Sequence, residues 1–100
     1  MNQKERMIKL YKDLRYDVQK YSFAYDASRR RIEKINSVLL KLKLTPSFSQ
    51  EQLLFSILRE RIEHEEEYCK SNMSNINRIN YRILDVKEWL IQYGLNPLEI

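Results

Sequence analysis

Apolar residues recur along the first half of the chain with the alternating three- and four-residue spacing of a packed helix face. One set of these positions is Tyr11, Val18, Tyr25, Ile32 and Leu39. The other set is Met7, Leu14, Tyr21, Ser28, Ile35 and Leu42. Ser28 is the one polar member of the two sets, and a register held this long is typical of a coiled-coil-like seam. We therefore predict a helix over about residues 3–44.

The second half of the chain carries its own seam. One set of positions is Phe55, Ile62, Cys69, Ile76, Ile83 and Leu90. The other is Leu58, Glu65, Asn72, Ile79, Val86 and Tyr93. These sets predict a second helix over about residues 50–93, although Glu65 and Asn72 place polar groups on the seam and residues 71–75 are poor helix formers.

Local signals mark the end of the first helix and the start of the second. Thr45-Pro46 stops the first helix, because proline disfavours helical geometry in the residue before it. Ser49 with Gln52 forms a capping box, and Phe48 with Leu53 forms a hydrophobic staple. These signals place a turn at residues 45–49.

The end of the second helix is equally well marked. Gly94 suits the left-handed position after the last turn, and Leu90 with Leu95 supplies the apolar contact of a Schellman motif. Pro97 follows, as is common beyond a helix end. We expect residues 94–100 to form a short tail.

Two helices of nearly equal length joined by a short turn predict an all-α fold, a long antiparallel helical hairpin that makes one domain of residues 1–100. If the turn is centred near residue 47, residue i faces about residue 94 − i. Ser28 then lies beside Glu65, Tyr25 faces Cys69, and the basic triplet 29–31 lies level with the acidic triplet 65–67. A break at 71–75 would instead give a three-helix bundle.

Composition narrows the possible functions. One glycine and two prolines are too few for a sheet or a loop-built site, and no apolar run approaches the roughly 20 residues of a membrane span. The N-terminal residues lack the apolar core of a signal peptide, and the single Cys69 cannot form an internal disulfide. We expect a cytoplasmic protein with no membrane association.

Catalytic and metal-binding residues are scarce. His64 is the single histidine and lacks the second ligand of a His-Glu-x-x-His helix. Cys69 falls on the seam, without a base or a positive field to activate it. Nothing in the chain provides a glycine-rich phosphate loop. We therefore expect no enzyme activity, no metal, no cofactor and no small-molecule substrate.

Large apolar residues lie off the seam in greater number than a two-helix core can bury. The candidates for a protein interface are Tyr16, Phe23, Tyr81, Leu84, Trp89 and Ile91. We predict that two hairpins associate into a four-helix bundle, and that the chain is a regulator, adaptor or inhibitor of a larger protein.

Charge supports an alternative function. Residues 1–44 carry twelve Lys/Arg against five Asp/Glu, while residues 45–100 carry six against nine. The basic candidates for nucleic-acid contact are Lys9, Lys12, Arg15, Lys20, Arg29, Arg30 and Arg31. Neutralisation of the arginine triplet by residues 65–67 is the competing interpretation, because charged outer faces are normal on exposed helices.

In size, basicity and helical content the chain is similar to small bacteriocin immunity proteins, which are four-helix bundles. Its wealth of Ile, Asn and Tyr and its scarcity of Ala and Gly also resemble small helical proteins of bacteriophages and mobile elements. That second resemblance implies a regulator or an inhibitor of a host protein. Both resemblances are of overall character and rest on no motif.

Overall fold

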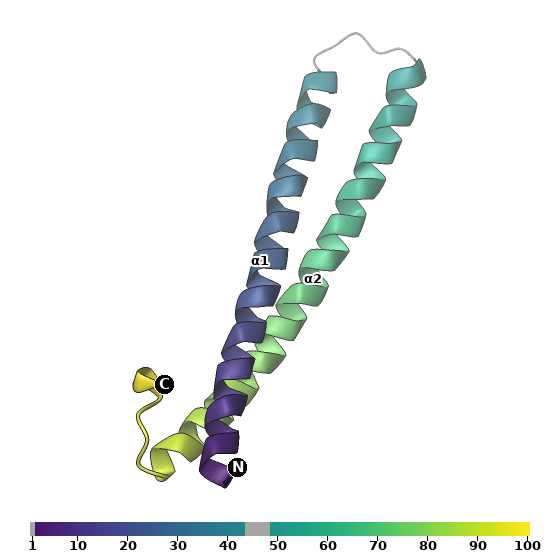
Figure 1. Ribbon diagram of the computed structural model, residues 1–100. Coiled ribbons are helices and arrows are strands. Elements are labelled where there is room, and N and C mark those ends of the chain that lie inside the picture. The colour runs from purple at the N-terminus through teal and green to yellow at the C-terminus, as the bar shows by residue number, and fades with distance from the viewer. Residues whose placement is uncertain (1, 44–48) are drawn as a thin grey trace. The chain divides into compact units, whose positions relative to one another are not determined.

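The computed structural model describes residues 2–43 and 49–100, with side chains for residues 2–42 and 53–100. Its elements are α1 (Gln3–Lys43), α2 (Ser49–Gln92) and a 3-10 helix, η1 (Pro97–Glu99) (Figure 1). The predicted all-α class and the two long helices are confirmed. α2 runs without interruption through residues 71–75, so the three-helix alternative is wrong.

Local contacts explain where the helices begin and end. Asn2 caps α1, because its side-chain oxygen accepts a hydrogen bond of 2.8 Å from the backbone N–H of Glu5. At the end of α2, Gly94 has φ 75°, and the N–H of Leu95 donates to the carbonyl of Leu90 at 3.0 Å. The N–H of Gly94 donates to the carbonyl of Ile91, also at 3.0 Å, which completes the predicted Schellman motif.

The predicted turn at 45–49 and its caps fall mostly outside the described residues. Residues 44–48, which include Phe48 of the staple, are not described. Neither are the side chains of Ser49 and Gln52, which carry the capping box. α2 begins at Ser49, one residue before the predicted start.

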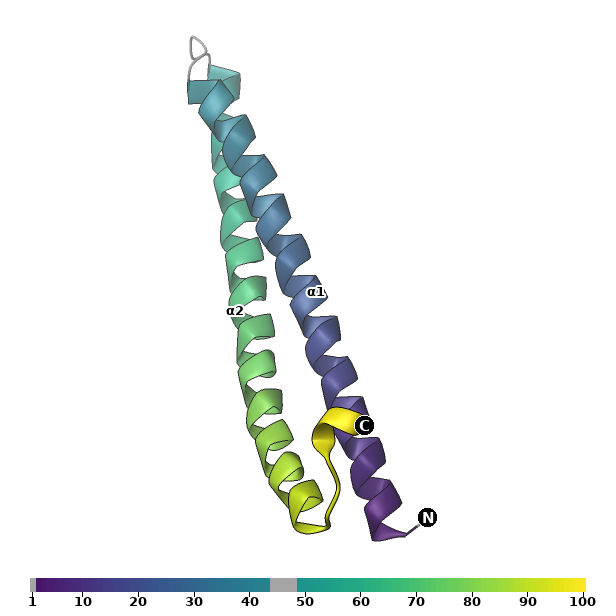
Figure 2. The same ribbon diagram turned by 90° about the vertical axis from the view of Figure 1, so that its left-hand side faces the viewer.

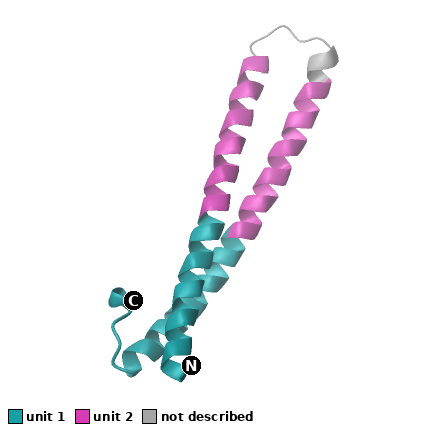
Figure 3. Ribbon diagram, viewed as in Figure 1, with its two compact units in different colours: residues 1–22, 73–100 teal, residues 23–72 magenta. Residues whose placement is uncertain are grey.

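The helices belong to two compact units, drawn in different colours in Figure 3. Unit 1 comprises Met1–Ser22 and Met73–Ile100, and unit 2 comprises Phe23–Asn72. Within each unit a segment of α1 lies antiparallel beside a segment of α2 (Figures 1 and 2). The predicted pairing of the two helices is therefore present in each unit.

Unit 1 has an apolar core. Its buried members are Tyr11, Leu14, Ile79, Ile83, Val86 and Leu90. The C-terminal tail returns to this core: Leu95 and Ile100 pack against it, and Pro97 is buried. Arg15 Nη1 donates a hydrogen bond of 3.0 Å to the backbone oxygen of Ile100. The segment that we expected to be only a tail is thus part of the fold.

Unit 2 has a mixed seam. Its buried residues are Ile32, Leu39 and Cys69 together with the polar Ser28 and Asn72. The thiol of Cys69 lies 3.9 Å from the carbonyl oxygen of Tyr25, which confirms that these two positions face each other. Ser28 lies beside Glu65, as the register predicted, because both contact the guanidinium of Arg31.

Candidate functional site

An exposed apolar stripe runs along α2 in unit 1. Tyr81, Leu84 and Ile91 are spaced by three and seven residues, and their exposed fractions are 72%, 57% and 61%. At 3.6 residues per turn this spacing keeps them on one face, about a third of a turn away from the face that carries Ile83 and Leu90. We call Tyr81, Leu84 and Ile91 the outer stripe.

The outer stripe borders a shallow hollow. Asn77, Asn80, Tyr81 and Leu84 line it, and its volume is about 350 Å³. Its polar groups are amides rather than charges, so covering this part of α2 costs less hydration free energy than covering a charged surface would. The composition suits a protein contact better than an ionic ligand.

Trp89 differs from the other predicted interface residues. Its indole is half-buried against the core of unit 1 and stacks on the ring of Tyr93, with ring centroids 4.0 Å apart. Trp89 therefore forms the edge of the core of unit 1. Phe23, in unit 2, is 73% exposed.

α1 presents basic residues in unit 1. Tyr16 is 68% exposed and lines a hollow of about 170 Å³ with Lys12, Arg15 and Gln19. Arg15 already donates a hydrogen bond to the backbone oxygen of Ile100, and its Cζ lies 5.5 Å from the centroid of the Tyr11 ring. The lysines predicted here, at positions 9, 12 and 20, are exposed and form no ion pair within the part of the chain that the structure describes.

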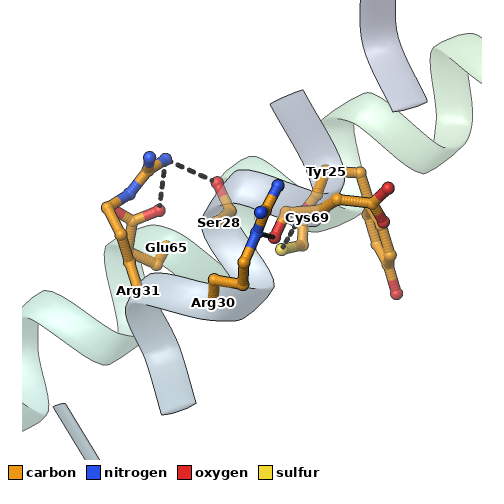
Figure 4. Close-up of polar contacts among 7 residues, drawn as sticks. Tyr25, Ser28, Arg30, Arg31, Glu65 and Cys69 are labelled. Atoms are coloured by element: carbon orange, nitrogen blue, oxygen red, sulfur yellow. Dashed lines mark hydrogen bonds and ion pairs between the residues drawn. The ribbon is translucent and has the colours of Figure 1, made fainter. Parts of the chain in front are cut away.

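The predicted match of the arginine triplet with the acidic triplet holds for one pair. Arg31 Nε lies 2.8 Å from Glu65 Oε1, and its Nη2 donates to Glu65 Oε2 at 3.1 Å and to Ser28 Oγ at 2.9 Å (Figure 4). Arg30 instead donates to the backbone oxygen of Asp26 in its own helix, and Arg29 is exposed. Two of the three arginines therefore form no ion pair with the acidic triplet, whose residues the structure describes.

The bidentate contact also sets the protonation of Glu65. The hydrogen bond from Arg31 lowers the pKa of the Glu65 carboxyl, the Ser28 hydroxyl and the charge of Arg31 lower it further, and partial burial acts in the opposite direction. The same hydrogen bond raises the pKa of Arg31. The contact with Arg31 therefore extends the ionised form of Glu65 to lower pH than in a free glutamate.

Unit 2 also contains a polar hollow that was not predicted from the sequence. Arg31, Arg61, His64, Glu65 and Tyr68 line a hollow of about 450 Å³. His64 was considered above as a metal ligand, and Arg61 was not among the predicted site residues. Their spacing with Tyr68, at i, i+3 and i+7, was the signal that could have identified one shared face of α2.

The described part of the chain contains neither a candidate metal site nor a candidate membrane-spanning helix. Within the described ranges, residues 2–43 and 49–100, no group of three or more His, Cys, Asp or Glu side chains could hold a metal ion. Among these same residues no helix is long and apolar enough to cross a membrane.

Comparison of the chain with protein-family models, with curated proteins and with solved structures gives no match. Function is therefore inferred from the surfaces described above.

Proposed function

We propose that this chain is a non-enzymatic protein-interaction module that docks through the outer stripe, and that its first partner is a second copy of itself. The observation that carries the proposal is the exposure of Tyr81, Leu84 and Ile91 beside a core that already buries its own seam. Exposed apolar area of this kind favours a partner, because covering it removes it from water.

The spacing of the outer stripe supports a helical partner. Residues three and seven apart form the kind of ridge that packs into the groove of another helix. A second copy supplies the same ridge, and a two-fold axis through the stripe lets each copy cover the other's apolar side chains. Two hairpins paired in this way make a four-helix bundle.

The biological role that we propose follows from this surface. A small module of this type acts by covering or presenting a face of a larger protein, as a regulator, adaptor or inhibitor. Tyr16, which is also exposed in unit 1, supplies a second aromatic contact for such a partner.

Analytical ultracentrifugation tests the dimer. The unaltered chain should sediment as a dimer at micromolar concentration. Leu84→Asp should give a monomer, because a carboxylate in the centre of an apolar interface is desolvated without a partner. Arg82→Asp, at an exposed neighbouring position off the outer stripe, should remain dimeric. An unaltered chain that is monomeric at these concentrations contradicts the proposal.

The alternative function rests on the basic face of α1. Lys9, Lys12 and Lys20 are exposed without an ion pair among the described residues, close in sequence to the exposed Tyr16. Unneutralised lysines beside an aromatic ring suit contact with a nucleic-acid backbone and bases. A mobility shift that weakens steeply with added salt would support this function, and the absence of a complex at low salt would eliminate it.

A further inference from the structure

We propose that the hollow of unit 2 lined by Arg31, Arg61, His64, Glu65 and Tyr68 binds a phosphate monoester that carries a small organic group. The site lies within unit 2 and does not depend on the outer stripe of unit 1. It uses the one cluster of described residues in which two guanidiniums, an imidazole and a phenol line the same hollow.

The guanidinium of Arg31 is fixed in orientation and keeps N–H groups that can donate to a ligand. A guanidinium has five N–H donors, and the contacts to Glu65 and Ser28 use those of Nε and Nη2. Nη1 makes none of these contacts. Because Glu65 and Ser28 fix the orientation of the guanidinium, Arg31 loses little side-chain entropy when it donates to a ligand.

The other three donors come from one face of α2. Arg61, His64 and Tyr68 follow one another at helical spacing and all have exposed side chains. Arg61 is close enough for its charge to lower the pKa of Glu65, and Tyr68 is close enough to influence the pKa of Arg31. The positive charges of Arg31 and Arg61 therefore lie at the same hollow.

The charges that line the hollow favour an anion. Two guanidiniums share it with one carboxylate, and both oxygens of that carboxylate already accept hydrogen bonds from Arg31. Glu60 and Glu67 are near in sequence but do not line the hollow. Their negative field weakens binding, so we place the dissociation constant in about the millimolar range, a binding free energy of about −4 kcal/mol.

The hollow also provides contacts for an organic group. Its volume of about 450 Å³ exceeds the space that an inorganic phosphate ion fills, and falls within the roughly 300–1,000 Å³ typical of small-molecule sites. Tyr68, which lines the hollow, is 49% exposed. An aromatic ester can rest on the Tyr68 ring while its phosphate contacts the guanidiniums.

His64 offers a direct readout, because a single histidine gives a single resolved imidazole Hε1 signal in a proton NMR spectrum. We would titrate the full chain with phenyl phosphate and with inorganic phosphate at fixed pH and ionic strength. The His64 signal should shift saturably with phenyl phosphate, and inorganic phosphate should bind at least fivefold more weakly.

Arg61→Gln and Arg59→Gln form the matched pair of variants, since both remove one positive charge from α2. Arg59 lies over the ring of Phe55, at 5.4 Å from its centroid, and does not line the hollow. Arg61→Gln should weaken phenyl phosphate binding at least fivefold, and Arg59→Gln by less than twofold. Circular dichroism would check that both variants keep their helical content.

Three results would overturn the proposal. One is a His64 signal that neither probe moves. Another is equal loss of binding in Arg61→Gln and Arg59→Gln, because this outcome means a diffuse charge effect. The third is equal affinity for the two probes, which removes the role of the organic group. Leu84→Asp should bind phenyl phosphate normally, which separates this site from the dimer interface.

Discussion

Units 1 and 2 are built from the same two helices, but their seams are stabilised by different interactions. In unit 1 the buried residues are all apolar, and Leu90 is fully inaccessible to solvent. In unit 2, Ser28 and Asn72 are buried in a smaller set of apolar residues, and Arg31 joins Glu65 across the pair of helices. Hydrophobic burial is non-directional and provides stability, whereas hydrogen bonds and ion pairs are directional and select one alignment of the helices.

This comparison assigns different roles to the two units. Unit 1 gains apolar burial from its tail as well as from both helices, so it should contribute more to the free energy of unfolding. Unit 2 contains Asn72, whose Nδ2 has no hydrogen-bond partner among the described residues, and should open more readily. Residue-resolved amide hydrogen exchange should therefore be slower in the core helices of unit 1 than in unit 2.

The largest effect should come from Leu90→Ala. Leu90 is 0% exposed, so the change removes buried methyl groups and leaves a cavity, at a cost of about 2–5 kcal/mol in the free energy of unfolding. Urea unfolding followed by circular dichroism measures this loss. Leu98→Ala, at a position in unit 1 that is 90% exposed, is the control and should change stability by less than about 0.5 kcal/mol. Equal effects would mean that the core of unit 1 is not the stabilising part.

Asn72→Leu should act in the opposite direction and stabilise the chain by about 1–2 kcal/mol. It removes a buried amide whose Nδ2 has no hydrogen-bond partner in the part of the chain that the structure describes. Ser71→Leu, at the exposed neighbouring position, makes a similar gain in helix propensity without changing the seam, and should give a smaller effect. A loss of stability in Asn72→Leu would show that the amide has an essential contact in unit 2.

Gly94→Ala should destabilise unit 1 by about 1 kcal/mol, because Gly94 has φ 75° and an L-residue is strained there. Apart from Gly94 and its two chain neighbours, no atom of the described residues lies within 4 Å of the position of an added Cβ, so the cost is conformational rather than a clash. Gly94→Asn, which tolerates this conformation better, should lose less. Thermal unfolding distinguishes the two, and equal melting temperatures would contradict the argument.

The smallest effect should be the pH dependence that Glu65 confers on unit 2. Its pKa is lower in the folded chain than in the unfolded chain, so its stabilising contribution is complete above the unfolded value of about 4.3 and is lost as the pH falls through the folded value. The stability of Glu65→Gln should therefore depend less on pH below about pH 5. Urea midpoints from pH 7 to pH 3 would test this, with Glu63→Gln as the exposed control.

Features set by neighbouring residues could be predicted from the sequence. The seven-residue pattern identified both helices, and Gly94 with Leu95 identified the end of α2 because a Schellman motif depends on six consecutive residues. The alignment of Tyr25 with Cys69 followed from two registers and one turn position. The cap at Asn2 was not predicted, although an asparagine directly before a helix is a common N-cap residue.

Features that depend on residues far apart in the chain required the tertiary structure. The sequence placed six basic and acidic residues level with each other, but side-chain reach decided that Arg31 alone of the arginine triplet meets Glu65. The return of the tail onto the unit 1 core, with Arg15 contacting Ile100 across 85 positions, had no local signal. The hollow that brings Arg31 to Arg61 and His64 likewise exists because two helices lie side by side. The sequence by itself determined the periodicity and the ends of the helices, because short-range geometry controls them. The tertiary structure decided which surface groups share a site, because that depends on the distances between side chains from both helices.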